Sequence, residues 1–241
     1  MLRVGLTGSL GSGKTTVAAM LRSLGAHVIE ADALGRELME PGHQVYDRIV
    51  STFGPGVLAA DGRLNRARLA ELAFRESRLD ELNAIVHPAV IELQRDLMRQ
   101  VFARDPKAVA VIESALIFEV VRDARARAER AAANPSGPAA PEWLTDWRRR
   151  IDRIIVITAP DRLKIDRYVA RLNPAPENRA AAESDAQSRL AHQIPDAEKA
   201  AQADYVIDNS GDLASLHSKV ASLWPRLLDE SNNSLHSLSL Q

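Results

Sequence analysis

Short apolar runs alternate along the chain with longer stretches in which hydrophobic residues recur at helical spacing. The apolar runs predict five strands, at residues 2–6, 27–30, 108–112, 153–157 and 205–207. The third run is apolar at every position, as expected of a strand that is covered on both faces. Because strands and helices alternate, the pattern predicts an α/β fold with a parallel, doubly wound sheet.

Between the second and third predicted strands the chain carries only helical patterns. They lie at residues 34–40, 43–53, 66–74, 76–86 and 88–103. Turns rich in Gly and Pro separate them. This arrangement predicts a helical lobe, at about residues 34–104, inserted between two strands of the sheet.

Two other segments differ from the rest of the chain in composition. Residues 122–141 are rich in Ala and Arg and end in several prolines, which predicts a solvated helix followed by a flexible linker. Residues 230–241 are rich in Ser, Asn and Leu, which predicts a flexible tail. We therefore expect a single domain over residues 1–229.

Composition and charge narrow the classes of function. The 241 residues suffice for one α/β domain with a substantial core. Basic and acidic side chains nearly cancel, 31 against 32, which argues against a nucleic-acid partner. The chain has no Cys, so disulfides and thiolate catalysis are excluded. No apolar run approaches the roughly 18–20 residues of a membrane helix, so we expect no membrane partner. The N-terminus enters a predicted strand directly and does not resemble a signal peptide, so we expect a cytoplasmic protein.

The most specific motif is the stretch Gly8–Thr15, which matches G-x-x-x-x-G-K-[S/T]. Its backbone N–H groups cradle a phosphate at a helix N-terminus, and glycines allow the backbone to approach closely. Lys14 would bridge the β- and γ-phosphates of ATP, and Thr15 would offer a hydroxyl to Mg²⁺. The alternative is a glycine-rich turn without a ligand. A strand before the motif and a helix at residues 14–24 favour the phosphate loop.

Two carboxylates follow predicted strands at the edge of the sheet where ligands bind. Asp32 could accept or orient the proton of an attacking hydroxyl, or it could cap a helix that begins at Ala33. Glu113 ends the third strand and could hold Mg²⁺ through water, or it could be a solvated strand end. Glu30 has the simpler interpretation of a structural residue.

Cationic and imidazole side chains supply further candidates. Arg167 and Arg171 lie one helical turn apart, and Arg189 follows in a later helix, so these arginines could close over a transferring phosphate from a mobile lid. Each could equally be a solvated surface residue. His87 precedes Pro88 at a junction between two predicted helices, where it could flank a helix cap or contact a ligand.

Taken together, these motifs resemble the dephospho-CoA kinase family over about residues 3–228. The resemblance rests on the order and spacing of Val4-Gly5-Leu6-Thr7-Gly8, Gly11-Ser12-Gly13-Lys14-Thr15-Thr16-Val17, Leu24-Gly25, Val28-Ile29-Glu30-Ala31-Asp32, Glu40-Pro41-Gly42, Phe53-Gly54, Asp61-Gly62, Leu64-Asn65-Arg66, Leu82-Asn83, Val86-His87-Pro88 and Ala203-Asp204-Tyr205-Val206-Ile207-Asp208-Asn209-Ser210-Gly211.

The resemblance implies a P-loop fold with a five-stranded parallel sheet, and transfer of the γ-phosphate of ATP to the ribose 3′-hydroxyl of dephospho-CoA. It implies a core at about residues 1–33, 105–170 and 200–229, a helical substrate lobe and a lid at about 171–199. It implies these roles: catalysis by Asp32, Lys14 and Arg171; nucleotide binding by Gly11, Ser12, Gly13, Lys14, Thr15, Thr16, Asn209 and Gly211; substrate binding by Asp32, His87, Arg167 and Arg189; and Mg²⁺ binding by Thr15 and, through water, Glu113. A monomer or weak homo-oligomer is expected.

The chain departs from the family pattern in several places. Glu30 replaces the usual Asp, Ala115 replaces a Pro, and residues at about 122–145 look like an insertion. Arg171 is followed by Leu172-Asn173-Pro174-Ala175-Pro176 where an Asp-Gly turn is common in the family, so the lid also departs from the pattern. The competing interpretations are another small-molecule P-loop kinase, acting on a nucleoside, nucleotide or sugar, and a nucleotide-dependent switch. The chain has no Asn-Lys-x-Asp guanine motif, which argues against a GTPase.

Overall fold

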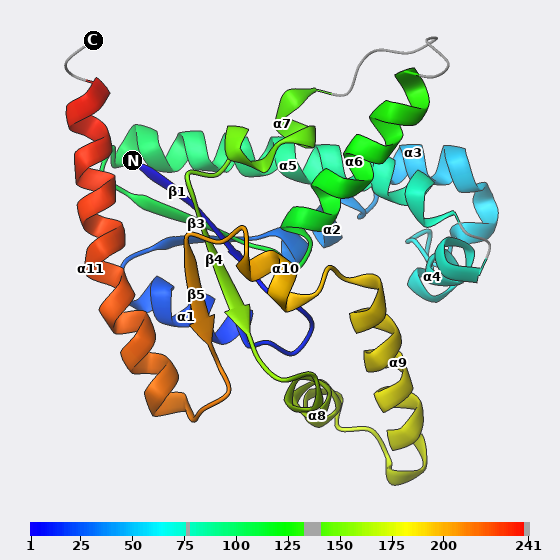
Figure 1. Ribbon diagram of the computed structural model, residues 1–241. Coiled ribbons are helices and arrows are strands. Elements are labelled where there is room, and N and C mark those ends of the chain that lie inside the picture. The colour runs from blue at the N-terminus through cyan, green and yellow to red at the C-terminus, as the bar shows by residue number, and fades with distance from the viewer. Residues whose placement is uncertain (76–77, 133–140, 239–241) are drawn as a thin grey trace.

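Figure 1 shows the computed structural model, which describes residues 1–75, 78–132 and 141–238. Five parallel strands form one sheet in the order β2-β3-β1-β4-β5. The strands are β1 (Leu2–Thr7), β2 (His27–Glu30), β3 (Val109–Glu113), β4 (Arg153–Thr158) and β5 (Tyr205–Asp208). The predicted α/β fold with a five-stranded parallel sheet is confirmed. Because all strands run the same way, their carboxyl ends meet at one edge, where a ligand crevice is expected.

Helices connect the strands. They are α1 (Lys14–Ser23), α2 (Ala31–Leu38), α3 (Gln44–Phe53), α4 (Arg66–Arg75), α5 (Leu79–Arg104), α6 (Ile117–Ala132), α7 (Glu142–Thr145), α8 (Asp161–Leu172), α9 (Arg179–His192), α10 (Asp196–Ala200) and α11 (Leu213–Leu238), with short 3₁₀ turns at Pro55–Val57, Trp147–Arg149 and Pro176–Asn178. Among the described helices none combines the length and hydropathy that a bilayer crossing requires.

Both faces of the sheet are covered, and the alternation of side chains along β4 shows this directly. Ile155 and Ile157 pack with α1 and α11 in the larger core cluster, whereas Ile154 and Val156 pack with α6 and Trp147 on the opposite face. This is the period of two that a strand imposes. Figure 1 shows α11 along one side of the molecule and α6 with α7 on the other.

The segment between β2 and β3 is helical, as the sequence predicts, and it has a hydrophobic cluster of its own. Val45 of α3, Leu72 of α4 and Ile85 of α5 contribute to that cluster. Farther along α5, Met98 packs against Ile112 of β3, so the same helix joins the lobe to the sheet. The assignment of this lobe to substrate binding stays a prediction.

One prediction inside this lobe is wrong. The sequence predicts two helices, at 76–86 and 88–103, but α5 runs unbroken from Leu79 to Arg104 with Pro88 inside it. Residues 76–77 lie outside the described part of the chain. A proline within a helix removes one hydrogen bond and costs about 3 kcal/mol. Packing of α5 against both the lobe and the sheet outweighs that cost, since tertiary contacts supply most of a helix's stability.

The predicted flexible tail is also wrong over most of its length. Helix α11 continues past residue 230 to Leu238. Ser231 is fully buried, and its hydroxyl donates hydrogen bonds to the carbonyls of Lys107 (2.9 Å) and Ala108 (3.2 Å). The terminal ammonium of Met1 donates to the Ser231 carbonyl at 3.2 Å. Packing therefore outweighs the low helix propensity of Ser and Asn. Residues 239–241, and the predicted linker at 133–140, lie outside the described residues.

Candidate active site

The loop between β1 and α1 has a backbone that only glycine permits, as Gly11 and Gly13 show. Gly11 has φ 72°, and a Cβ there would lie 2.2 Å from the carbonyl oxygen of Lys164. Gly13 has φ 100°, and a Cβ there would lie 2.2 Å from the side-chain nitrogen of Asn209. Gly13 caps α1, so the free N–H groups and the positive end of the helix dipole face this loop. The geometry suits a bound phosphate.

Lys14 is the first residue of α1, and its half-buried ammonium donates to the Ser9 carbonyl at 3.1 Å. Burial lowers the pKa of Lys14 to about 8. Glu113 and Asp32 act in the opposite direction and raise this pKa, while Arg171 lowers it further. The loop lysine, both predicted carboxylates and one predicted lid arginine therefore lie within electrostatic reach of one another.

The two carboxylates occupy different environments. Asp32 lies in the first turn of α2, which begins one residue earlier, so it is not the cap of a helix that starts at Ala33. Its side chain is exposed. Glu113, at the end of β3, is only 8% exposed, and burial raises its pKa, an effect that Lys14 opposes. Glu30 forms an ion pair with Arg22 at 2.7 Å, consistent with its structural interpretation.

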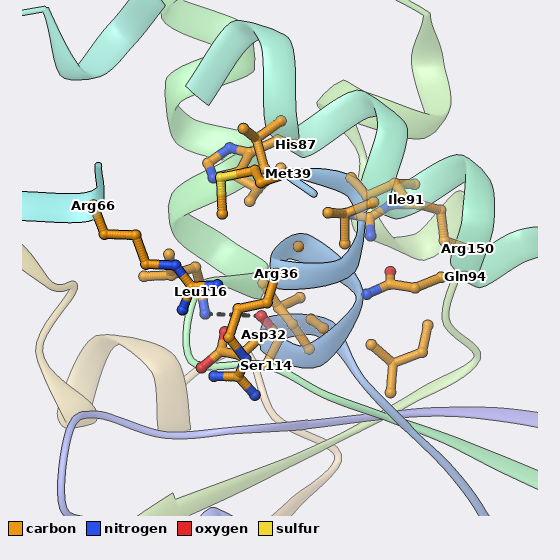
Figure 2. Close-up of a pocket in the computed structure, with 17 residues that line it drawn as sticks. Asp32, Arg36, Met39, Arg66, His87, Ile91, Gln94, Ser114, Leu116 and Arg150 are labelled. Carbon is orange, nitrogen blue, oxygen red and sulfur yellow. Dashed lines mark hydrogen bonds between the residues drawn. The ribbon is translucent and has the colours of Figure 1, made fainter. Parts of the chain in front are cut away.

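Beside Asp32 lies a cavity of about 420 Å³ between α2, α5 and the start of α6. Figure 2 shows His87 and Met39 on one side of it and Asp32 with Ser114 across from them. His87 lies inside α5, so it does not flank a helix cap. Burial lowers the pKa of His87 to about 4, so the ring is neutral at pH 7, and its Nδ1 has no hydrogen-bond partner among the described residues. The cavity thus places a neutral imidazole opposite an exposed carboxylate.

The predicted lid arginines lie on α8 and α9, which pack against each other. The guanidinium groups of Arg171 and Arg189 lie 5.6 Å and 5.9 Å from the centre of the Tyr168 ring. Arg189 donates to Asp185 at 2.8 Å, and the Tyr168 hydroxyl donates to the same carboxylate at 2.6 Å. Arg167 is half-buried, and its Nη1 has no hydrogen-bond partner in the described part of the chain. None of the three arginines is among the described residues that line the cavity.

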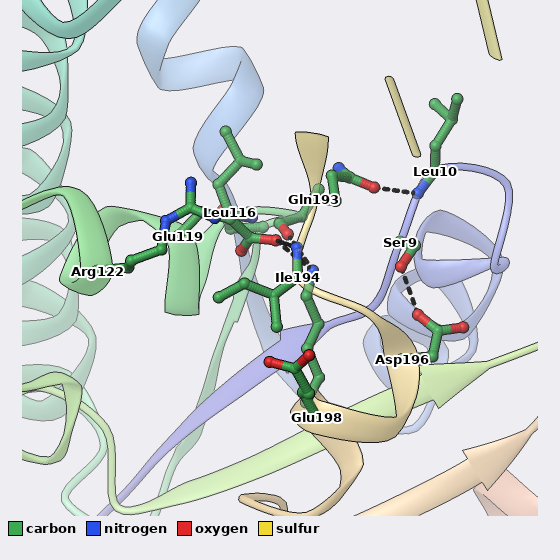
Figure 3. A network of polar contacts seen from close by, with 12 residues as sticks. Ser9, Leu10, Leu116, Glu119, Arg122, Gln193, Ile194, Asp196 and Glu198 are labelled. Carbon is green, nitrogen blue, oxygen red and sulfur yellow. Dashed lines mark hydrogen bonds and ion pairs between the residues drawn. The ribbon is translucent and has the colours of Figure 1, made fainter. Parts of the chain in front are cut away.

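The segment that follows α9 binds the phosphate loop, a contact that the sequence does not reveal. The Leu10 N–H donates to the Gln193 side-chain oxygen at 2.9 Å, and Ser9 donates to Asp196 (Figure 3). Asp196 also accepts a hydrogen bond from the buried Lys164 at 2.8 Å. Burial alone would raise the pKa of Asp196, but the contacts with Lys164 and Ser9 hold this pKa below its usual value. The loop is therefore attached to the base of the predicted lid.

The same segment is anchored on its other side to α6. Lys199 is fully buried and forms an ion pair with Glu119 at 2.8 Å. Glu119 also accepts from the Ile194 N–H at 2.9 Å, and Lys199 donates to the Ala115 carbonyl at 3.1 Å. We call residues 193–199 the strap. In the sequence Asp196 and Lys199 look like ordinary surface residues, so the pattern of the chain does not identify their contacts.

Asn209, in the segment after β5, holds the phosphate loop by a hydrogen bond. Its side-chain nitrogen donates to the Ser12 carbonyl at 2.8 Å, and its backbone N–H donates to Thr158 at 2.8 Å. Asn209 is buried, and Gly211 is exposed in the turn after β5. The predicted contact of these two residues with the nucleotide stays a prediction.

Oxygen donors suited to Mg²⁺ lie beside the loop. Thr15 and Thr16 are exposed in the first turn of α1, and Glu113 and Asp32 lie near Lys14. Hydroxyl and carboxylate oxygens are the ligands that Mg²⁺ takes, usually together with water and substrate phosphates. The described residues include no group of three or more His, Asp or Glu side chains that could hold a metal ion by themselves.

Comparison with known proteins agrees with this geometry. The family model described as dephospho-CoA kinase matches residues 2–131 and 142–215, and so leaves out a stretch within the predicted insertion at 122–145. A dephospho-CoA kinase of Thermobifida fusca is 37% identical over 228 residues, which cover 94% of this chain and 96% of that protein. A dephospho-CoA kinase of Geobacillus kaustophilus is 36% identical over 212 residues, with coverage of 87% and 89%.

Solved structures show the same fold. The crystal structure of TT1252 from Thermus thermophilus superposes with a TM-score of 0.65 at 28% identity and covers 93% of this chain and 96% of that one. Dephospho-CoA kinase from Campylobacter jejuni superposes with a TM-score of 0.52 at 19% identity, with the same coverage, and supports the fold alone. From the family match and the identities to its relatives we conclude that the chain belongs to the dephospho-CoA kinase family.

Proposed function

We propose that this protein transfers the γ-phosphate of ATP to the ribose 3′-hydroxyl of dephospho-CoA, giving coenzyme A and ADP in the final step of coenzyme A biosynthesis. The observation that carries the proposal is the position of Asp32. Its side chain lines the cavity and also lies within electrostatic reach of Lys14 in the phosphate loop. One carboxylate would therefore lie between the phosphate loop and an acceptor in the cavity.

In the proposed reaction Asp32 accepts or orients the proton of the attacking hydroxyl. Lys14 and the N–H groups of residues 11–16 stabilise the negative charge that develops on the phosphates. Thr15 and, through water, Glu113 would hold Mg²⁺. When bound, the metal would neutralise part of the phosphate charge.

Arg171 and its neighbours on α8 and α9 act in this proposal as a lid. Arg171 already lies close enough to lower the pKa of Lys14. Closure would bring Arg167, Arg171 and Arg189 toward the phosphates and exclude water, which limits hydrolysis of ATP. His87 would contact the acceptor across the cavity.

We further propose that the protein works in the cytoplasm as a monomer or weak homo-oligomer. Its partners in this proposal are small molecules, and neither nucleic acid nor membrane.

An acceptor panel tests the proposal against its rivals. ADP release is measured with ATP and Mg²⁺ alone, and then with dephospho-CoA, nucleosides, nucleotides or sugars as acceptors. We expect dephospho-CoA to give the largest kcat/KM, with little release in its absence. Turnover with another acceptor but not with dephospho-CoA would indicate a different small-molecule kinase. Slow hydrolysis that no acceptor stimulates would indicate a switch.

A further inference from the structure

Arg150 is a buried cation that forms no ion pair among the described residues, although the Asp146 carboxylate lies near enough to act against the effect of burial on its pKa. It precedes β4, is only 4% exposed, and lines the same cavity as Asp32. Its Nε and Nη2 atoms are buried with no hydrogen-bond partner, and the ion pairs of the described residues do not include it. Burying an unpaired guanidinium costs several kcal/mol, so a group outside the described residues is expected to compensate it.

Gln94 gives this end of the cavity a second unused polar group. It is 3% exposed, lines the cavity from α5, and makes no side-chain hydrogen bond within the described part of the chain. Figure 2 shows Arg150 and Gln94 together on one side of the cavity, beside Ile91, with Arg66 on the opposite side. An amide and a guanidinium thus share a wall that is otherwise apolar. Ionic contacts are strong in such surroundings because the local dielectric constant is low.

The charge of the lining favours an anion as the compensating group. Among the described residues that line the cavity, Arg36, Arg66 and Arg150 are cationic and Asp32 is the single carboxylate. Burial lowers the pKa of Arg150 to about 10, so its guanidinium remains charged at pH 7. A neutral nucleobase would supply a hydrogen-bond acceptor but would leave the positive charge of Arg150 uncompensated. Phosphate oxygens supply hydrogen-bond acceptors and also the negative charge that compensates the guanidinium.

We propose that Arg150, assisted by Gln94, binds the diphosphate of the acceptor. This inference rests on the proposed function, because dephospho-CoA carries a diphosphate on the 5′ position of the ribose whose 3′-hydroxyl is phosphorylated. Asp32 and Arg150 line one cavity, so the acceptor's sugar lies between them, with its hydroxyl toward Asp32 and its diphosphate toward Arg150. Arg150 thereby selects acceptors that carry phosphate.

The test compares Arg150→Met with the wild type, using the KM for dephospho-CoA and the Ki of adenosine as a competitor. Adenosine has the same sugar and base but no phosphate. We expect Arg150→Met to raise the KM for dephospho-CoA about 30-fold or more, the usual effect of truncating one partner of a buried charge pair. The Ki of adenosine should change less than about threefold. Arg150→Lys should recover part of the loss because it retains a point charge.

Arg149→Met is the matched control, since that neighbouring side chain is exposed and does not line the cavity. A purely structural role predicts a lower Tm for Arg150→Met, whereas our proposal predicts an unchanged or higher Tm, because an apolar side chain replaces an unpaired buried charge. Parallel weakening of adenosine and dephospho-CoA, an unchanged KM, or a lowered Tm would each overturn the subsite. A wild-type protein without dephospho-CoA turnover would instead refute the proposed function, and the subsite with it.

Discussion

Lys14 lies where burial and neighbouring charges oppose each other. Burial lowers its pKa to about 8, and Asp32 and Glu113 offset only part of that effect. A bound phosphate would favour the charged ammonium, so ATP binding and protonation of Lys14 are linked. The sequence identifies Lys14 from the motif alone. Its titration depends on side chains from β3, α10, α2 and α8, which the sequence does not bring together.

This linkage predicts how ATP affinity depends on pH. The contribution of protonated Lys14 is fully present below about pH 8 and is lost as the pH rises through that value, because the free protein then releases the proton. We expect the Kd for ATP to rise about fivefold between about pH 8 and about pH 9, as measured by titration calorimetry. Lys14→Arg, which stays protonated, should show a flat profile over that range. The same slope in both proteins would show that another group titrates.

Asp32 is the residue whose replacement should separate chemistry from binding. We expect Asp32→Asn to lower kcat by about 10²–10⁴-fold, the range for loss of a general base, while the Kd for ATP changes less than about threefold. Steady-state kinetics and calorimetry measure the two quantities. Glu30→Gln is the matched control, because Glu30 is paired with Arg22 and does not line the cavity. Near-normal turnover of Asp32→Asn would remove this carboxylate from the mechanism.

At the scale of elements, the strap of residues 193–199 connects three parts of the site. It holds the phosphate loop through Gln193 and Asp196, and it is fixed to α6 by the ion pair of Lys199 with Glu119. It also continues from α9, which carries Arg189. The Lys199–Glu119 pair is the more deeply buried of the two ion pairs that hold this strap, since the other joins Asp196 to Lys164.

Breaking that pair should destabilise the protein strongly. Lys199→Met leaves Glu119 buried and uncompensated, so we expect a loss of about 3–5 kcal/mol in the free energy of unfolding, measured by urea denaturation. The double variant Lys199→Met/Glu119→Leu should recover most of this loss, because it removes the unpaired charge. Arg22→Met breaks an exposed pair and should cost no more than about 1 kcal/mol. A comparable small cost for Lys199→Met would contradict the role given to the strap.

Periodicity located the elements well but not the tertiary contacts between them. The apolar run predicted at 27–30 coincides with β2, and the other four strands differ from their predictions by one or two residues. Prediction failed where distant packing decides the outcome, as in the continuous α5 with Pro88 inside it. It also failed for Arg150, which nothing in the run Arg148-Arg149-Arg150 distinguishes from its exposed neighbours. The motif residues around Lys14 were predicted because their chemistry is local.

In the molecule as a whole, the amino terminus lies against the last helix, α11. The Met1 ammonium donates to the carbonyl of Ser231, and the Ser231 hydroxyl binds the carbonyls of Lys107 and Ala108 just before β3. Figure 1 shows α11 lying beside the start of β1. A segment whose composition predicts a tail thus covers the amino-terminal edge of the sheet.

Truncation tests whether the end of α11 stabilises the fold. A chain that ends at Asp229 loses a fully buried residue and its hydrogen bonds, each worth about 0.5–1.5 kcal/mol, so we expect a Tm lower by several degrees. A chain that ends at Leu238 should keep the wild-type Tm. Thermal unfolding by circular dichroism distinguishes the two. Equal Tm values for both truncated proteins would mean that the end of α11 adds nothing to the fold.

The position of the transferred phosphate is the direct test of phosphorylation at the 3′-hydroxyl of dephospho-CoA. The protein is incubated with ATP, Mg²⁺ and dephospho-CoA, and the product is examined by ³¹P NMR, with the 2′-deoxy and 3′-deoxy analogues as matched acceptors. We predict a new 3′-phosphate, retained transfer to the 2′-deoxy analogue and none to the 3′-deoxy analogue. Transfer to the 3′-deoxy analogue, or no transfer to dephospho-CoA at all, would contradict the proposed activity.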